Sequence, residues 1–138
     1  PYQGRVRVGC LSSYKNYLYR LYDTVLSRAY IETERLVFDD QFNQGGSIEG
    51  WLRFHDGSLL EFNETVVLRN QQIVKLRYAY QYQDETASLI FRYDNAPHYR
   101  SLPTFPDHKH VSDRVESAVA PDLNQVLYEI EQILFTVD

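Results

Sequence analysis

His108 and His110 are the residues of this 138-residue chain whose type and spacing point most directly to chemistry. In an extended segment, side chains two positions apart point the same way, so both imidazoles could face one substrate while Lys109 turns aside. Imidazole titrates near neutral pH and therefore moves protons or binds metal ions under physiological conditions. His98 precedes them in the same proline-rich segment, and Asp94 stands just before that segment. We expect the loop to fold back and bring all four side chains together.

Such a cluster suits two chemistries and one structural role. In metal-free cleavage of RNA, one imidazole would accept the 2′-hydroxyl proton, another would protonate the leaving oxygen, and Lys109 or an arginine would hold the phosphate. Alternatively, the imidazoles and the carboxylate of Asp94 would bind a divalent metal ion. In the structural interpretation, the histidines hydrogen-bond backbone carbonyl groups and hold the loop against a sheet.

We predict the first of these chemistries, a metal-independent RNA endonuclease that uses no cofactor. Its catalytic candidates lie in or beside the proline-rich loop and are Asp94, His98, His108 and His110. Its substrate-binding candidates are cationic or aromatic neighbours of that loop, namely Arg92, Tyr93 and Lys109. Asp94 and Asn95 also favour a turn, since both side chains readily hydrogen-bond the local backbone and Pro97 follows.

A helix, a sheet and a second helix must position these residues. Residues 12–29 place apolar side chains at three- and four-residue steps, which predicts an amphipathic helix capped by Ser12 or Ser13. Alternating segments predict five antiparallel strands, at 33–42, 47–54, 58–68, 73–82 and 87–93. Pro121 and Asp122 suit the first turn of a closing helix. The predicted fold is α+β in one domain over residues 1–138. It comprises an N-terminal helix, a five-stranded antiparallel meander, the histidine- and proline-rich loop, and a C-terminal helix.

The segment 73–82 has the clearest alternation. The residues on one face are apolar or aromatic: Val74, Leu76, Tyr78, Tyr80 and Tyr82. The tyrosines could stack exposed bases, but the neighbouring aliphatic residues favour a core position. The opposite face carries Lys75 and Arg77, which together with Arg92 would form a small basic patch.

The net charge of −5 is unevenly distributed. Residues 115–138 carry five acidic and no basic side chains, whereas residues 1–37 have an excess of three positive charges. Because nonspecific nucleic-acid binding requires many cations, the whole-chain charge argues against it and leaves only a local basic face.

The single cysteine, Cys10, excludes an internal disulfide, and no run of about 18 apolar residues occurs. We therefore expect a cytoplasmic protein that does not enter a membrane.

Several short motifs occur together in an order that is similar to a known family. They are residues 56–62, 76–84, 89–98 and 102–106, then His108-Lys109-His110, and finally residues 123–130. Through these motifs the chain resembles the TumE family of bacterial toxin–antitoxin proteins. The resemblance implies a small cytoplasmic toxin whose partner is a helix-turn-helix antitoxin, and it leaves the reaction open. A helix followed by an antiparallel sheet is also similar to RelE-like ribosome-dependent RNA endonucleases, at the level of the fold alone.

Two functions from different classes follow. The first is a toxin that acts on RNA or on the ribosome through the histidine-rich loop. The second is a noncatalytic module whose aromatic sheet and acidic C-terminal helix bind a partner or a second copy of the chain. RNA cleavage by the purified protein would favour the first function, and a stable oligomer without cleavage would favour the second.

Overall fold

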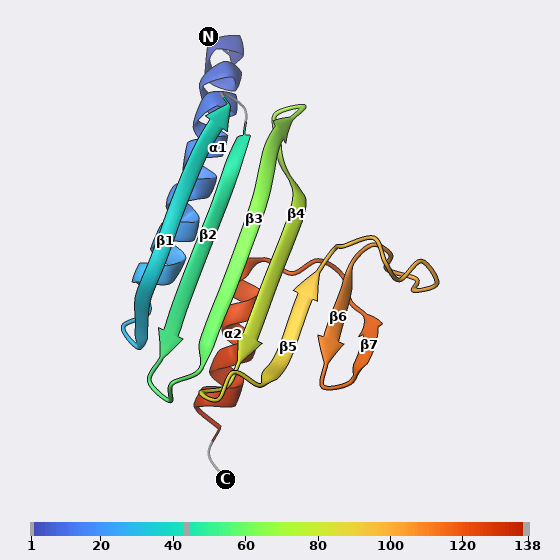
Figure 1. Ribbon diagram of the computed structural model, residues 1–138. Coiled ribbons are helices and arrows are strands. Elements are labelled where there is room, and N and C mark those ends of the chain that lie inside the picture. The colour runs from blue at the N-terminus through green and yellow to red at the C-terminus, as the bar shows by residue number, and fades with distance from the viewer. Residues whose placement is uncertain (1, 43–44, 137–138) are drawn as a thin grey trace.

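Two helices and one seven-stranded sheet make up the part of the chain that the structure describes (Figure 1). The computed structural model describes the backbone of residues 2–42 and 45–136, and within these the side chains of 14–39 and 45–136. The strands lie in chain order from β1 to β7, each antiparallel to its neighbours. Helix α1 precedes the sheet and α2 follows it. The predicted α+β class and the antiparallel meander are therefore confirmed.

Short connections join the first five strands, as predicted. The strands are β1 Ile31–Phe42, β2 Gly45–Phe54, β3 Leu59–Arg69, β4 Gln72–Gln83, β5 Leu89–Asp94, β6 His108–Val111 and β7 Arg114–Ser117. The five predicted strands correspond to β1 to β5 within two residues at either end. Alternating apolar residues therefore locate the long strands well, because each of these strands buries one face.

The sheet has seven strands rather than the predicted five, and the two additional strands form one hairpin. Strands β6 and β7 were not predicted; β6 begins within the segment expected to be a loop. Each is only four residues long, with the largely polar sequences HKHV and RVES, so neither shows an apolar alternation. Their turn contains no glycine, although Ser112 takes a positive φ of 56° that usually marks glycine or asparagine. The hairpin matters because a strand fixes the direction in which His108 and His110 point.

Helix α1 spans Tyr2–Leu26 and so begins well before the predicted start. Ser12 and Ser13 lie inside it, and the predicted cap at these residues is wrong. The side chain of Cys10 lies outside the described side chains. Figure 1 shows that the first turns of α1 extend past the ends of the strands, while its later turns lie behind β1 and β2.

Helix α2, Leu123–Leu134, begins at a capping box. The side chain of Asp122 accepts a hydrogen bond from the Gln125 backbone at 2.7 Å, and the Gln125 side chain accepts one from the Asp122 backbone at 2.9 Å. This reciprocal pair satisfies two amide groups that a helix start leaves without partners. The prediction of a closing helix at this point is confirmed. Its buried residues form one stripe: Leu123, Val126, Leu127 and Ile130.

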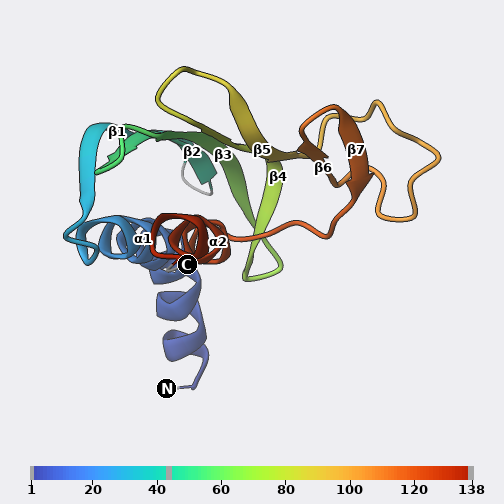
Figure 2. The same cartoon turned by 90° about the horizontal axis from the view of Figure 1, so that it is seen from below.

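Both helices cover the same face of the sheet and leave the other face uncovered (Figure 2). The hydrophobic core lies between the two helices and the sheet face that they cover. Its sheet residues alternate along the central strands and include Ile48, Leu52, Leu60, Phe62, Tyr80, Tyr82 and Phe91. The tyrosine stripe of β4 therefore belongs to the core, as its aliphatic neighbours predicted, and it is not a platform for exposed bases.

A buried polar cluster ties the helices to this core. Glu64, on β3, is fully buried and accepts hydrogen bonds from the hydroxyls of Tyr17 in α1 and Tyr80 in β4. The Nζ atom of Lys75 donates to the Tyr80 hydroxyl at 2.6 Å and to the carbonyl of Pro121 at 2.7 Å. Burial lowers the pKa of Lys75. The cluster thus links α1, two strands and the segment before α2.

The position of Lys75 corrects the predicted pattern of β4. The pairing of β3 with β4 shifts by one residue between Thr65 and Val66, which face Arg77 and Lys75 respectively. This β-bulge adds Leu76 to β4, so Lys75 points toward the helices and Leu76 is largely exposed. Strict alternation had placed these two residues the other way round.

Candidate functional site

Pairing of β5 with β6 brings four polar side chains to one face of the sheet. Asp94 pairs with His108, and Arg92 pairs with His110. Directly opposed residues of antiparallel strands point to the same side. Lys109, between the two histidines, points the other way and contacts a carboxylate of α2. The four side chains therefore lie on the face that no helix covers.

Asp94 is the centre of this cluster. Its Oδ1 atom lies 3.0 Å from Nε2 of His108 and accepts a hydrogen bond from the Ala96 backbone at 3.0 Å. Its Oδ2 atom lies 2.9 Å from Nε of Arg92 and 3.5 Å from Nε2 of His110. A buried carboxylate is retained only where donors and cations compensate it. The Ala96 contact also forms the turn predicted at Asp94 and Asn95.

His108 is the most deeply buried member of the cluster, with 1% of its surface exposed. Its Nδ1 atom lies 2.9 Å from the carbonyl oxygen of Pro106, which can only accept a hydrogen bond. Its Nε2 atom faces Asp94. Both ring nitrogens therefore face oxygen atoms that can accept a hydrogen bond. Because it is buried, His108 is suited to orienting Asp94 rather than to touching a substrate.

His110 is the histidine of the cluster that solvent reaches, with 26% of its side chain exposed. Its ring lies 4.9 Å from that of His108. The pKa of His110 is lowered, first because burial disfavours the charged ring and also because His108 and Arg92 repel a proton, although Asp94 acts in the opposite sense. The ring is therefore neutral at neutral pH, the state in which imidazole accepts a proton.

Arg92 joins the cluster to an open pocket. Its Nη1 atom donates to Gln81 at 2.8 Å, and 37% of its side chain is exposed. The Asp94 pocket, as we call it, has a volume of about 620 Å³. Strands β3, β4 and β5 and both ends of the β5–β6 loop line it, with the residues Asn63, Leu76, Arg77, Tyr78, Ala79, Arg92, Asp94, Asn95, Ala96, Pro97 and Pro106.

Three predicted site residues lie apart from this cluster. His98 is exposed on the β5–β6 loop, and its ring is 6.5 Å from that of Tyr99. Tyr93 and Lys109 lie on the helix side of the sheet, where both bind Glu129 of α2, at 2.6 Å and 2.7 Å. The structure therefore brings together Arg92, Asp94, His108 and His110, and it gives Tyr93 and Lys109 a contact between sheet and helix.

Tyr99 is a site residue that the sequence did not reveal. Its ring packs against the rings of His108 at 4.8 Å and His110 at 5.7 Å. It thereby covers the buried histidine and restricts the exposed one. The contacts of an irregular loop leave no periodic pattern in a sequence, so periodicity could not identify Tyr99. Its position next to His98 was the one feature of the sequence that could have suggested a place in the site.

The donor set also resembles that of a metal site. Asp94, His108 and His110 offer ligand atoms that all lie within 4.8 Å of one another. Against this use, the Arg92 guanidinium already contacts Oδ2 of Asp94, and the direct contact of 3.0 Å with His108 fits a proton between the two groups. A metal ion would have to replace that proton beside a fixed cation. The contacts therefore favour an acid–base cluster.

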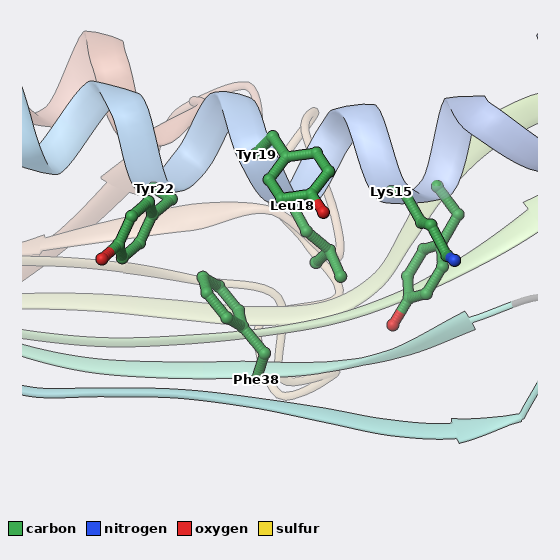
Figure 3. A pocket seen from close by; sticks show the side chains of 6 residues that line it. Lys15, Leu18, Tyr19, Tyr22 and Phe38 are labelled. Carbon is green, nitrogen blue, oxygen red and sulfur yellow. The ribbon is translucent and has the colours of Figure 1, made fainter.

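A second pocket lies between α1 and β1 and is mostly apolar (Figure 3). Its volume is about 340 Å³, and its lining residues are Tyr14, Lys15, Leu18, Tyr19, Tyr22 and Phe38. The rings of Tyr22 and Phe38 meet edge to face at 6.2 Å, and Tyr19 is 64% exposed. With Lys15 as its charged lining residue, this pocket suits contact with another molecule better than catalysis.

The fold and the cluster define an α+β protein with a histidine–aspartate site on the open face of an antiparallel sheet. The chain belongs to the family described as Toxin TumE, whose family model matches residues 22–134. The resemblance predicted from the motifs is thus confirmed, and the match begins earlier than those motifs. Membership of a toxin family implies an antitoxin as partner.

Neither the curated proteins nor the solved structures contain a match to this chain. Among the described residues, no helix has both the length and the apolar character needed to span a membrane.

Proposed function

We propose that this protein is a toxin that cleaves RNA by metal-independent acid–base chemistry at the Asp94 cluster. The observation that carries the proposal is His110, a partly exposed and neutral imidazole in one cluster with His108 and the guanidinium of Arg92. A neutral base next to fixed positive charge is the combination that phosphodiester cleavage through the 2′-hydroxyl requires. The antitoxin that family membership implies would be a helix-turn-helix protein, as the motif resemblance indicates.

In this mechanism, a ring nitrogen of His110 accepts the proton of a 2′-hydroxyl group. The 2′-oxygen attacks the adjacent phosphorus, the bond from phosphorus to the 5′-oxygen breaks, and a 2′,3′-cyclic phosphate forms. Arg92 stabilises the negative charge that develops on the phosphate. The leaving 5′-oxygen takes a proton from water or from His98, the exposed imidazole of the β5–β6 loop. Asp94 holds Arg92 and the two histidines of β6 in place.

Controlled expression in bacteria tests the proposal. The wild-type chain should stop growth and shorten cellular RNA, and a His110→Gln chain expressed to the same level should do neither. His55→Gln is a matched control, because His55 lies near the β2–β3 turn and stacks on Phe135, away from the cluster. Equal growth arrest by the wild-type and His110→Gln chains would contradict the assignment of the base.

A second function rests on the apolar pocket between α1 and β1. Its exposed aromatic residues, Tyr19, Tyr22 and Phe38, favour a noncatalytic interaction module that binds a partner or a second copy. This surface replaces the aromatic sheet face that the sequence predicted, since that face is buried in the core. A stable oligomer with no cleavage of RNA, measured by light scattering and an RNA assay on one preparation, would favour this function over the first.

A further inference from the structure

The Asp94 pocket has a cation toward each end. Arg92 pairs with Gln81, and Ala79 pairs with Asp94, so Arg77 lies two residues further along β4 on the same open face. Four strand residues separate the level of Arg92 from that of Arg77, which is about 14 Å. The pocket lies between them, with the reacting cluster beside Arg92.

Arg77 is the more available of the two cations. It is exposed, and among the described residues it has no ion-pair partner within 4.0 Å. Arg92 uses Nε for Asp94 and Nη1 for Gln81, and its Nη2 atom makes no such contact with the described side chains. Both guanidinium groups therefore have N–H donors that make no hydrogen bond within the part of the protein that the structure describes. Such donors bind anionic groups, so a ligand in the pocket would carry negative charge toward each end.

A small residue forms the floor of the pocket. Ala79 is flanked in register by Asn63 on β3 and Asp94 on β5. Its methyl group leaves the space that a larger side chain would fill. Asn63 is exposed and offers an amide donor and acceptor at this floor.

The wall of the pocket is held rigidly. The Asn95 side chain accepts a hydrogen bond from the Tyr78 backbone at 3.1 Å and donates one to the carbonyl of Leu76 at 3.0 Å. It therefore pairs with β4 at the bulge, where the regular ladder is interrupted. Pro97 and Pro106 complete the wall with restricted backbone. A preformed pocket lowers the entropy cost of binding.

We infer that the Asp94 pocket binds a short unpaired segment of an RNA strand, next to the phosphate that is cleaved. Arg92 holds the scissile phosphate, Arg77 holds a phosphate further along the same segment, and Asn63 contacts the edge of a base between them. A base in a duplex has that edge occupied by its partner, so the pocket selects single-stranded substrate. The inference rests on the proposed function and adds the substrate class.

Binding of a fluorescein-labelled single-stranded RNA tests the inference. The probe carries 2′-O-methyl groups, which prevent cleavage, and its dissociation constant is measured by fluorescence anisotropy over a range of salt. Arg77→Ala should raise the Kd about tenfold and lower the salt slope by about 1, because one phosphate contact is lost. Ala79→Leu should weaken binding at least as much by filling the floor. The same RNA annealed to its complement should bind more weakly to the wild-type protein.

Arg35→Ala is the matched control, because Arg35 is an exposed arginine that pairs with Glu49 outside the pocket. Its Kd should equal that of the wild-type protein. Circular dichroism and thermal unfolding establish whether each variant is folded. If Ala79→Leu does not fold, Arg77→Ala, which changes an exposed side chain, tests the pocket by itself.

The outcomes separate this inference from the proposed function. If the wild-type protein cleaves RNA and both pocket variants bind and cleave as it does, the pocket assignment is overturned and the proposed function stands. If the duplex binds as tightly as the single strand, the selection of unpaired nucleotides is overturned. If the wild-type protein neither binds nor cleaves RNA, both proposals fall.

Discussion

At the scale of single residues, the site depends on the different environments of two neighbouring histidines. His108 is buried between two acceptors, and His110 is partly exposed beside His108 and Arg92. Loss of a general base typically costs a factor of about 10² to 10⁴ in rate. We expect His110→Gln to reduce RNA cleavage by about that factor with an unchanged unfolding temperature. Cleavage within about twofold of the wild-type rate would remove His110 from the mechanism.

The same residue sets the pH dependence. Because the pKa of His110 is lowered, the neutral ring persists below the ordinary histidine value of 6.5. The cleavage rate should stay constant as the pH falls toward 6.5 and should decline only below it. A rate profile with saturating RNA measures this. Loss of activity that is already complete at pH 6.5 would contradict the lowered pKa.

His98 can be tested by substitution. If it protonates the leaving oxygen, His98→Gln should lower the cleavage rate of a single-stranded RNA at neutral pH by about tenfold or more. An unchanged rate in His98→Gln would identify water as the proton source.

Sequence spacing predicted part of the site. His108 and His110 do share one face with Asp94 and Arg92, as positions two apart in extended chains imply. The same alternation turns Lys109 to the helix side. The Pro106 carbonyl and the Tyr99 ring belong to an irregular loop, whose contacts no period in the sequence could specify.

At the scale of elements, the Asn95 side chain joins the start of the β5–β6 loop to β4. Asn95 bonds the backbone of Tyr78 and Leu76 at the bulge of β4, directly beside Asp94. Asn95→Ala removes one part-buried and one exposed hydrogen bond to the β4 backbone, and each such bond typically contributes about 0.5–1.5 kcal/mol. We expect a lower urea midpoint and weaker cleavage, because the turn that presents Asp94 loosens. Asn124→Ala, at an exposed hydrogen bond to Arg28, is the control and should change stability by less than about 0.5 kcal/mol. An equal effect of both variants would contradict the role of Asn95.

The long elements could be predicted because each buries an apolar face, and the short hairpin could not. Strands β1 to β5 and helix α2 carry clear periods, whereas β6 and β7 exist because β5 offers a free edge. The bulge at Leu76 could not be predicted, because no glycine or break in the alternation of residues 73–82 marks it. It shifts the register by one residue and therefore reverses the faces expected for Lys75 and Leu76.

At the scale of the whole molecule, the arrangement of layers explains how an acidic chain could bind RNA. The helices cover one face of the sheet, and α2 with the residues just before it carries Glu116, Asp122, Glu129 and Glu131 and no basic residue. The uncovered face carries Arg77, Arg92 and the cluster. Binding should therefore involve few phosphate contacts and depend only moderately on salt. The prediction of a single domain over residues 1–138 stays a prediction.

The chemical identity of the cleaved ends tests the central proposal most directly. Purified protein is incubated with a single-stranded RNA in the presence of excess EDTA, and the products are examined by mass spectrometry. Acid–base attack by the 2′-hydroxyl predicts cleavage that EDTA does not slow, leaving 2′,3′-cyclic phosphate and 5′-hydroxyl ends. It also predicts no cleavage where the nucleotide 5′ to the scissile phosphate is 2′-deoxy. Cleavage that EDTA abolishes, or products with 3′-hydroxyl and 5′-phosphate ends, would contradict the account.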